Sequence, residues 1–130
     1  MNIRIYNNLP EADRLITIRN ACNQLGNELY DICQKSEKID FETKSKLTKK
    51  ICAEYARQGI QSMLGVFAQA DITIEYDESN AISLANVISK MSNENYDELI
   101  YQIDQFNINL EDTIEKERSK ESKTEPKNEM

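Results

Sequence analysis

The chain has 130 residues, of which 39% are hydrophobic, and it carries a formal net charge of −7 at pH 7. A chain of this length fits one domain with a modest core and leaves no room for a second. The acidic balance disfavours extended nucleic acid as a partner, and the absence of histidine removes the usual neutral-pH general base and every Ser/His or Cys/His nucleophile, so we expect no enzyme.

The N-terminal part of the sequence predicts a short strand followed by a long helix. Residues 2–6 alternate as a strand does, and Pro10 then precedes a helix with Glu11 and Asp13 in its first turn. Apolar side chains recur along this helix every three or four positions, at Leu15, Ile18, Cys22, Leu25, Leu29 and Ile32. This spacing indicates one amphipathic helix.

The polar stretch 34–40 separates the first helix from a second one, which is predicted over residues 41–70 with Asp40 or Ser36 as its N-cap. The apolar face of the second helix again repeats at intervals of four and three. Small side chains occupy part of that face, at Cys52, Ala56 and Gly59. We expect the two helices to pair as an antiparallel hairpin, with their closest approach at these small residues.

Residues 71–76 alternate with period two, which places Ile72, Ile74 and Tyr76 on one side of the chain. Two alternatives remain open for this segment: it pairs with residues 2–6 as a two-stranded ribbon, or it is simply extended. A two-stranded ribbon is marginally stable by itself, so it would need to pack on the hairpin or on another subunit.

Two further amphipathic helices are predicted before the C-terminal tail. Ser79 can cap the first, and Ser92 can cap the second, which continues to about Leu110. Residues 115–130 are almost entirely polar with charges of alternating sign, which predicts a disordered tail after a single helical domain at 1–114. The predicted fold is therefore mainly α: an antiparallel helical hairpin plus two further amphipathic helices, with a small two-stranded β ribbon as an option.

The sequence also predicts a cytoplasmic location and no metal or cofactor. No apolar run approaches the roughly 18 to 20 residues that a bilayer span needs, and the start of the chain lacks the apolar centre of a signal peptide. Three cysteines, an odd number without a CxxC pair, are typical of buried thiols in a reducing compartment. Neither acidic cluster, at 71–78 or at 111–115, has the spacing of a calcium loop, so both are expected to be solvated surface.

The densest basic stretch follows the start of the second predicted helix and is the candidate ligand site. Lys49, Lys50 and Arg57 lie where they would meet phosphates through charge-assisted hydrogen bonds. A tyrosine, Tyr55 or Tyr6, would then stack on a base. The alternative is a solvated helix face on which the basic charges are balanced by Glu37, Glu42 and Glu54.

Regular apolar stripes on the second and fourth predicted helices favour association with identical subunits or with another protein. The core of a small domain with a polar tail does not by itself require such regular apolar stripes, so we expect a homo-oligomer. The second functional hypothesis is therefore a protein-interaction module, an inhibitor or accessory subunit. Such a module would offer an amphipathic helix face or an acidic surface to a protein partner.

The predicted hairpin is similar to that of a known family. Residues 12–70 resemble the helical hairpin of the phage anti-CBASS and anti-Thoeris proteins, the Acb2/Tad1 family, through the segments ITIRNACNQLGNELYDI and KKICAEYARQGIQSMLGVFAQ. The resemblance rests on Leu25-Gly26 followed by Leu29, and on Gln58-Gly59-Ile60 through Met63. It implies a cytosolic sponge: a small oligomer that binds cyclic nucleotide or cyclic ADP-ribose signals without cleaving them, so that a host defence effector is never activated.

Overall fold

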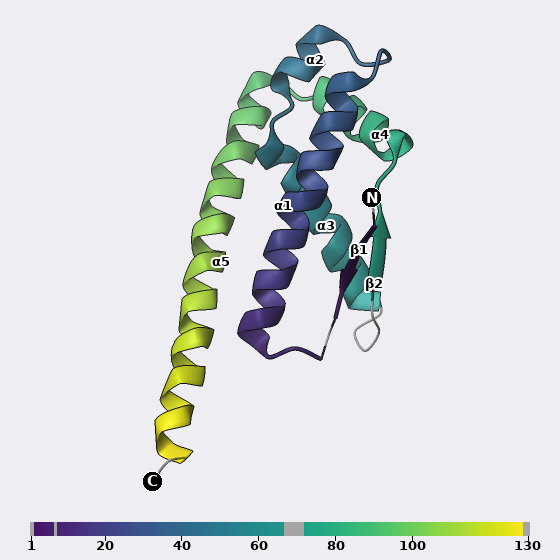
Figure 1. Cartoon of the computed structure of the whole chain (residues 1–130). Helices are drawn as coiled ribbons and strands as arrows, with labels where there is room; N and C mark the ends of the chain where they lie inside the picture. The colour runs from purple at the N-terminus through teal and green to yellow at the C-terminus, as the bar shows by residue number, and fades with distance from the viewer. Residues whose placement is uncertain (1, 7, 67–71, 129–130) are drawn as a thin grey trace.

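The computed structural model describes residues 2–6, 8–66 and 72–128 (Figure 1). In chain order the elements are β1 (Asn2–Ile5), α1 (Glu11–Lys35), α2 (Phe41–Lys46), α3 (Lys49–Val66), β2 (Ile72–Glu75), α4 (Glu78–Ser89) and α5 (Asn93–Asn128). The fold is mainly α with one small antiparallel sheet, as predicted. In Figure 1 the antiparallel pair α1 and α3 forms the centre, the β-ribbon lies along one side, and α5 lies along the other.

α1 and α3 approach each other so closely that one position of α1 admits no side chain. A Cβ atom on Gly26 would lie 2.5 Å from the Cα atom of Ala53, well inside van der Waals contact. The predicted close approach was placed at Cys52, Ala56 and Gly59. Cys52 and Ala56 are fully buried. Gly59, however, faces the hydroxyl of Tyr76, the residue directly after β2. The prediction missed the contact at Gly26 because the small residue that permits it belongs to α1.

The prediction of one continuous helix over 41–70 is wrong at Leu47 and Thr48, where α2 ends and α3 begins. Asp40 caps α2, since its carboxylate accepts a hydrogen bond of 2.7 Å from the backbone N–H of Thr43. Leu47 is extended and buried, and the Thr48 hydroxyl accepts a hydrogen bond of 3.2 Å from the backbone N–H of Ile51. α3 therefore begins as a separate helix at a point where the apolar pattern alone predicts that the preceding helix continues. The predicted end over 67–70 lies outside the described residues.

The two short strands pair with each other, which is one of the two alternatives that the sequence leaves open. β1 and β2 are antiparallel, with Ile3 opposite Ile74 and Ile5 opposite Ile72. All four isoleucines are buried in one cluster with side chains of the hairpin, among them Ala21, Cys22, Leu25, Ala56 and Ile60. A two-stranded ribbon gains its stability from such packing, and here the hairpin provides it.

α4 closes the core at the end of the hairpin where α2 lies. Its N-cap is Asp77, which accepts a hydrogen bond of 3.1 Å from the backbone N–H of Asn80, so the predicted cap at Ser79 is wrong by two residues. Both Asp and Ser are good caps, and the pattern alone did not separate them. The predicted cap of the following helix is confirmed, because the Ser92 hydroxyl accepts a hydrogen bond of 3.2 Å from the N–H of Asn95.

α5 extends along the hairpin and continues past its end (Figure 1). Residues 115–130 are predicted to be a disordered tail, whereas the structure continues α5 as helix through Asn128. Residues 129–130 lie outside the described residues. The residues after Ile114, the last buried residue along the described side chains, are mostly Glu, Lys and Arg, which are good helix formers, and Glu117 pairs with Lys120 at 3.2 Å. Among the described segments, no helix combines the length and the apolar character needed to cross a membrane.

Candidate functional site

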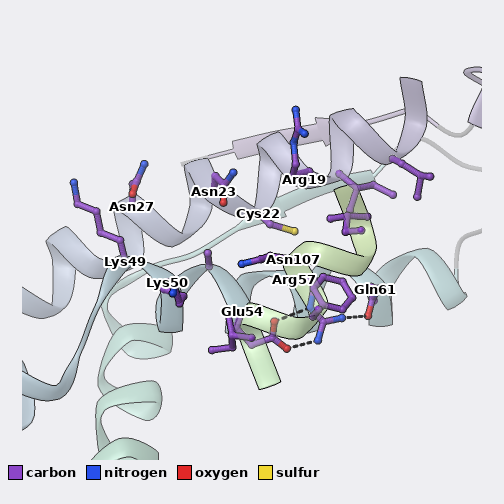
Figure 2. Close-up of a pocket in the computed structure, with 16 residues that line it drawn as sticks. Arg19, Cys22, Asn23, Asn27, Lys49, Lys50, Glu54, Arg57, Gln61 and Asn107 are labelled. Carbon is purple, nitrogen blue, oxygen red and sulfur yellow. Dashed lines mark hydrogen bonds and ion pairs between the residues drawn. The ribbon is translucent and has the colours of Figure 1, made fainter. Parts of the chain in front are cut away.

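A pocket of about 390 Å³ lies between α1, α3 and α5, and we call it the three-helix pocket (Figure 2). Its volume falls within the range of roughly 300 to 1,000 Å³ that is typical of small-molecule sites. Its apolar side chains come from all three helices and include Ile18, Cys22, Ala53, Ile103, Phe106 and Leu110. An apolar floor of this kind suits a ligand with a flat, hydrophobic part.

Four basic side chains and one acidic side chain also line the three-helix pocket: Arg19, Lys49, Lys50, Arg57 and Glu54. Two of the cations are paired with acids of α5. The Nζ of Lys50 lies 2.5 Å from the carboxylate of Asp104, and the guanidinium of Arg19 lies 2.6 Å from the carboxylate of Glu111. Each of these pairs remains partly exposed, so the pocket offers positive charge that a ligand can reach.

Arg57 has the most constrained position in the pocket. Its guanidinium is hydrogen-bonded to the buried carboxylate of Glu54, with an Nε to Oε2 distance of 2.8 Å, and to Gln61 at 2.5 Å (Figure 2). The same guanidinium lies over the ring of Phe106, 4.1 Å from its centroid. The hydrogen bond to Glu54 raises the pKa of Arg57 above its ordinary value, so this group is a permanent cation.

Three asparagines also belong to the polar lining: Asn23, Asn27 and Asn107. Their side-chain amides form no hydrogen bond with any other described residue. Figure 2 shows Asn107 near Cys22 and Arg57, whereas Asn23 and Asn27 stand along α1. Each amide can both donate and accept, so these groups can meet the polar edge of a ligand ring.

The sulfur of the pocket belongs to Cys22, and burial raises the pKa of this thiol to about 11. The thiol therefore stays protonated near neutral pH, and a protonated thiol is a poor nucleophile. Cys33 and Cys52 are buried in the core as well, and all three cysteines are free. Their predicted role as buried thiols is confirmed.

The structure brings three of the five predicted site residues together. Lys49, Lys50 and Arg57 line the three-helix pocket. Tyr55 lines a smaller pocket of about 220 Å³ with Tyr76, Leu84 and Val87, because a residue two positions from Arg57 points to another side of the helix. Tyr6 lies just beyond β1, where it is exposed, and it lines neither pocket. The aromatic ring beside Arg57 is Phe106.

Sequence reasoning missed the contributions of α1 and α5 to the pocket. The α1 residues had a usable signal, because Arg19, Asn23 and Asn27 are spaced by four and follow one edge of the apolar seam. Phe106 and Asn107 had no such signal. They are about fifty residues from Arg57 in sequence, and only the packing of α5 places them beside it.

Compared with models of known protein families, with curated proteins and with solved structures, the chain matches none of them.

Proposed function

We propose that this chain is a non-enzymatic binding protein that sequesters a small anionic ligand with a planar ring in the three-helix pocket. The ligand class is that of cyclic nucleotide or cyclic ADP-ribose signals, and the protein would act as a phage-type sponge in the cytoplasm. The observation that carries the proposal is the clustering of Lys49, Lys50 and Arg57 beside an apolar floor in a pocket of about 390 Å³.

The basic side chains supply the binding of phosphate. Lys49 has no carboxylate partner among the described residues, and its Nζ lies 5.9 Å from the ring centroid of Tyr30. Lys50 is next to it in the chain and lines the same pocket. Hydrogen bonds between ammonium groups and phosphate oxygens are charge-assisted and are about twice as strong as neutral ones. Two adjacent lysines at the start of α3 therefore form a suitable place for a phosphate.

Phe106 and the asparagine amides of the pocket would bind a planar ring. Stacking of a base on an aromatic ring contributes roughly 1 to 3 kcal/mol. The Phe106 ring already carries the guanidinium of Arg57 against it, so a nucleobase would meet a flat apolar surface next to a fixed cation. Asn107 would accept from and donate to the edge of that base.

The absence of histidine supports binding without cleavage. The pocket's Cys22 thiol is protonated near neutral pH, and its one lining carboxylate, Glu54, is hydrogen-bonded to Arg57. These groups are poorly placed for nucleophilic or general-base chemistry on a phosphodiester. A protein that holds a signal and leaves it intact fits this set of residues.

A melting experiment tests the proposal. The melting temperature is recorded with a panel of cyclic di- and trinucleotides and cyclic ADP-ribose isomers, because a ligand that binds only the folded state raises it. One member should produce a concentration-dependent rise in the wild type. The rise should be lost in Lys49→Ala/Lys50→Ala and kept in the matched control Lys44→Ala/Lys46→Ala, which removes the same charge from α2. An equal rise in both double variants would refute the assignment of the lysines.

The second candidate function is a protein-interaction module, that is, an inhibitor or accessory subunit. The observation that favours it is the exposure of Tyr101 and Ile108, which are 60% and 55% exposed. They lie seven residues apart and so share one face of α5. This candidate predicts that no panel member changes the melting temperature and that a protein partner does. Solution mass, measured alongside, would report a homo-oligomer.

A further inference from the structure

Three contacts of charged side chains join residues 104–114 of α5 to the hairpin, and each involves a cation of the three-helix pocket. Asp104 pairs with Lys50 at 2.5 Å, Glu111 pairs with Arg19 at 2.6 Å, and the Phe106 ring carries the guanidinium of Arg57 at 4.1 Å. The acids of α5 thus occupy, in the free protein, the positive charges that an anionic ligand would use.

The two acids have a defined separation. Asp104 and Glu111 are seven residues apart, which is about two turns, so they lie on one face of α5 and about 10 Å apart along its axis. Their carboxylate oxygens mark two positions at which an anion is held by a pocket cation. Phe106 and the apolar floor line the same pocket as these two cations.

We infer that the ligand carries two anionic groups about 10 Å apart on a flat or apolar middle, and that α5 competes with it through Asp104 and Glu111. This inference rests on the proposed function, because it assumes that the pocket takes a small anionic ligand. On binding, one anionic group replaces Asp104 at Lys50, the other replaces Glu111 at Arg19, and the two carboxylates turn toward water.

Replacement of an α5 carboxylate by a phosphate of the ligand, at Lys50 or at Arg19, is favourable. Both ion pairs are partly exposed, and exposed pairs of Lys or Arg with Asp or Glu contribute little to stability because water screens them. A phosphate offers more acceptor oxygens and a greater charge than a carboxylate, so it forms stronger hydrogen bonds with the same donors. The acids would therefore lower the affinity of the pocket, and a ligand with two anionic groups would bind more tightly than one with a single anionic group, because it replaces both acids.

The test uses the full chain and a homologous series of linear alkane bisphosphonates, from ethylene to decylene, measured by titration calorimetry. Affinity should reach a maximum at the chain length that places the phosphonates about 10 Å apart. Asp104→Asn/Glu111→Gln should bind this probe about tenfold more tightly, since a competing charge pair is removed. The control Asp112→Asn/Glu98→Gln removes the same two charges from other positions of α5 and should change the affinity less than about twofold.

Three results would overturn the inference: no bisphosphonate binds, a matched alkyl monophosphonate binds as tightly as the best bisphosphonate, or the two double variants gain equally. These results are distinguishable from failure of the proposed function. A nucleotide that binds through Lys49 and Lys50 with no response to Asp104→Asn/Glu111→Gln refutes only the competition by α5. A bisphosphonate optimum at the expected length without any nucleotide binding keeps the two-anion pocket and refutes the nucleotide class.

Discussion

Arg57 of α3 and Phe106 of α5 form a cation–π pair in which the guanidinium carbon lies 4.1 Å from the ring centroid. The pair joins α5 to the hairpin in the lining of the three-helix pocket. It also combines, at one point, the two chemical features that a nucleotide needs: a permanent positive charge and a flat apolar surface.

Replacing Phe106 by alanine should therefore weaken ligand binding. The loss of a stacking surface is expected to cost about 1 to 3 kcal/mol, which is roughly a fivefold to hundredfold fall in affinity. The matched control is Tyr101→Ala, which removes an aromatic ring from the exposed face of the same helix. Titration calorimetry with the best panel ligand should show the fall for Phe106→Ala alone. An equal affinity in the two variants would contradict a role for this ring.

Gly26→Ala should destabilise the protein. Alanine gains up to about 1 kcal/mol over glycine within a helix, but its Cβ would meet the backbone of Ala53 at 2.5 Å. Overpacking of this kind costs about 1 to 3 kcal/mol, so denaturant unfolding should show a net loss. Gln24→Ala, at an exposed position of α1, is the control and should be close to neutral.

Ala53→Gly should fail to rescue Gly26→Ala. The clashing atoms include the Cα and backbone N of residue 53, and those atoms remain after the methyl group is removed. Recovery of wild-type stability in the double variant would show that only the methyl group of Ala53 was in the way.

The free energy of unfolding should fall with pH above about 9, provided that the thiols are kept reduced. Burial raises the pKa of Cys33 from 9.0 to about 11 and that of Cys52 to about 12. Between pH 9 and these raised pKa values, the unfolded chain loses thiol protons that the folded chain keeps. The stability contributed by the protonated thiols is therefore complete below pH 9 and declines as the pH rises.

A cysteine variant separates the effect of the thiols from that of two partly buried tyrosines, which also lower the stability at high pH. Burial also raises the pKa of Tyr55 and Tyr76, which adds to the decline at higher pH. Cys33→Ala should therefore show a shallower decline of unfolding free energy between pH 9 and 11 than the wild type, whatever its stability at pH 7. Parallel curves for the two proteins would contradict the assigned role of Cys33.

The fold was largely predictable because its main signals are local. The apolar spacing of α1, with Cys22, Leu25 and Leu29 all buried, depends only on neighbours three and four residues away. The break at Leu47 and Thr48 was not predicted. Leu47 fits the apolar pattern of a continuous helix, and its burial in an extended conformation depends on tertiary packing.

The site residues were predictable only where they lie together on one helix. Lys49, Lys50 and Arg57 were singled out from local sequence, and α3 does place them in one pocket. Tyr55 was chosen because it is near in sequence, but the helical twist directs it to another pocket. The aromatic partner, Phe106, reaches Arg57 through the packing of α5, and no spacing rule connects positions so far apart.

The most direct test of the three-helix pocket as a ligand site is a map of backbone amide shifts by two-dimensional NMR. The 15.1 kDa protein would be titrated with the same panel of cyclic nucleotides and cyclic ADP-ribose isomers. We expect one ligand to shift amides around Asn23, Arg57 and Asn107 on the three facing helices. Shifts confined to the smaller pocket near Tyr55 and Val87, or no shifts with any ligand, would contradict a ligand site in the three-helix pocket.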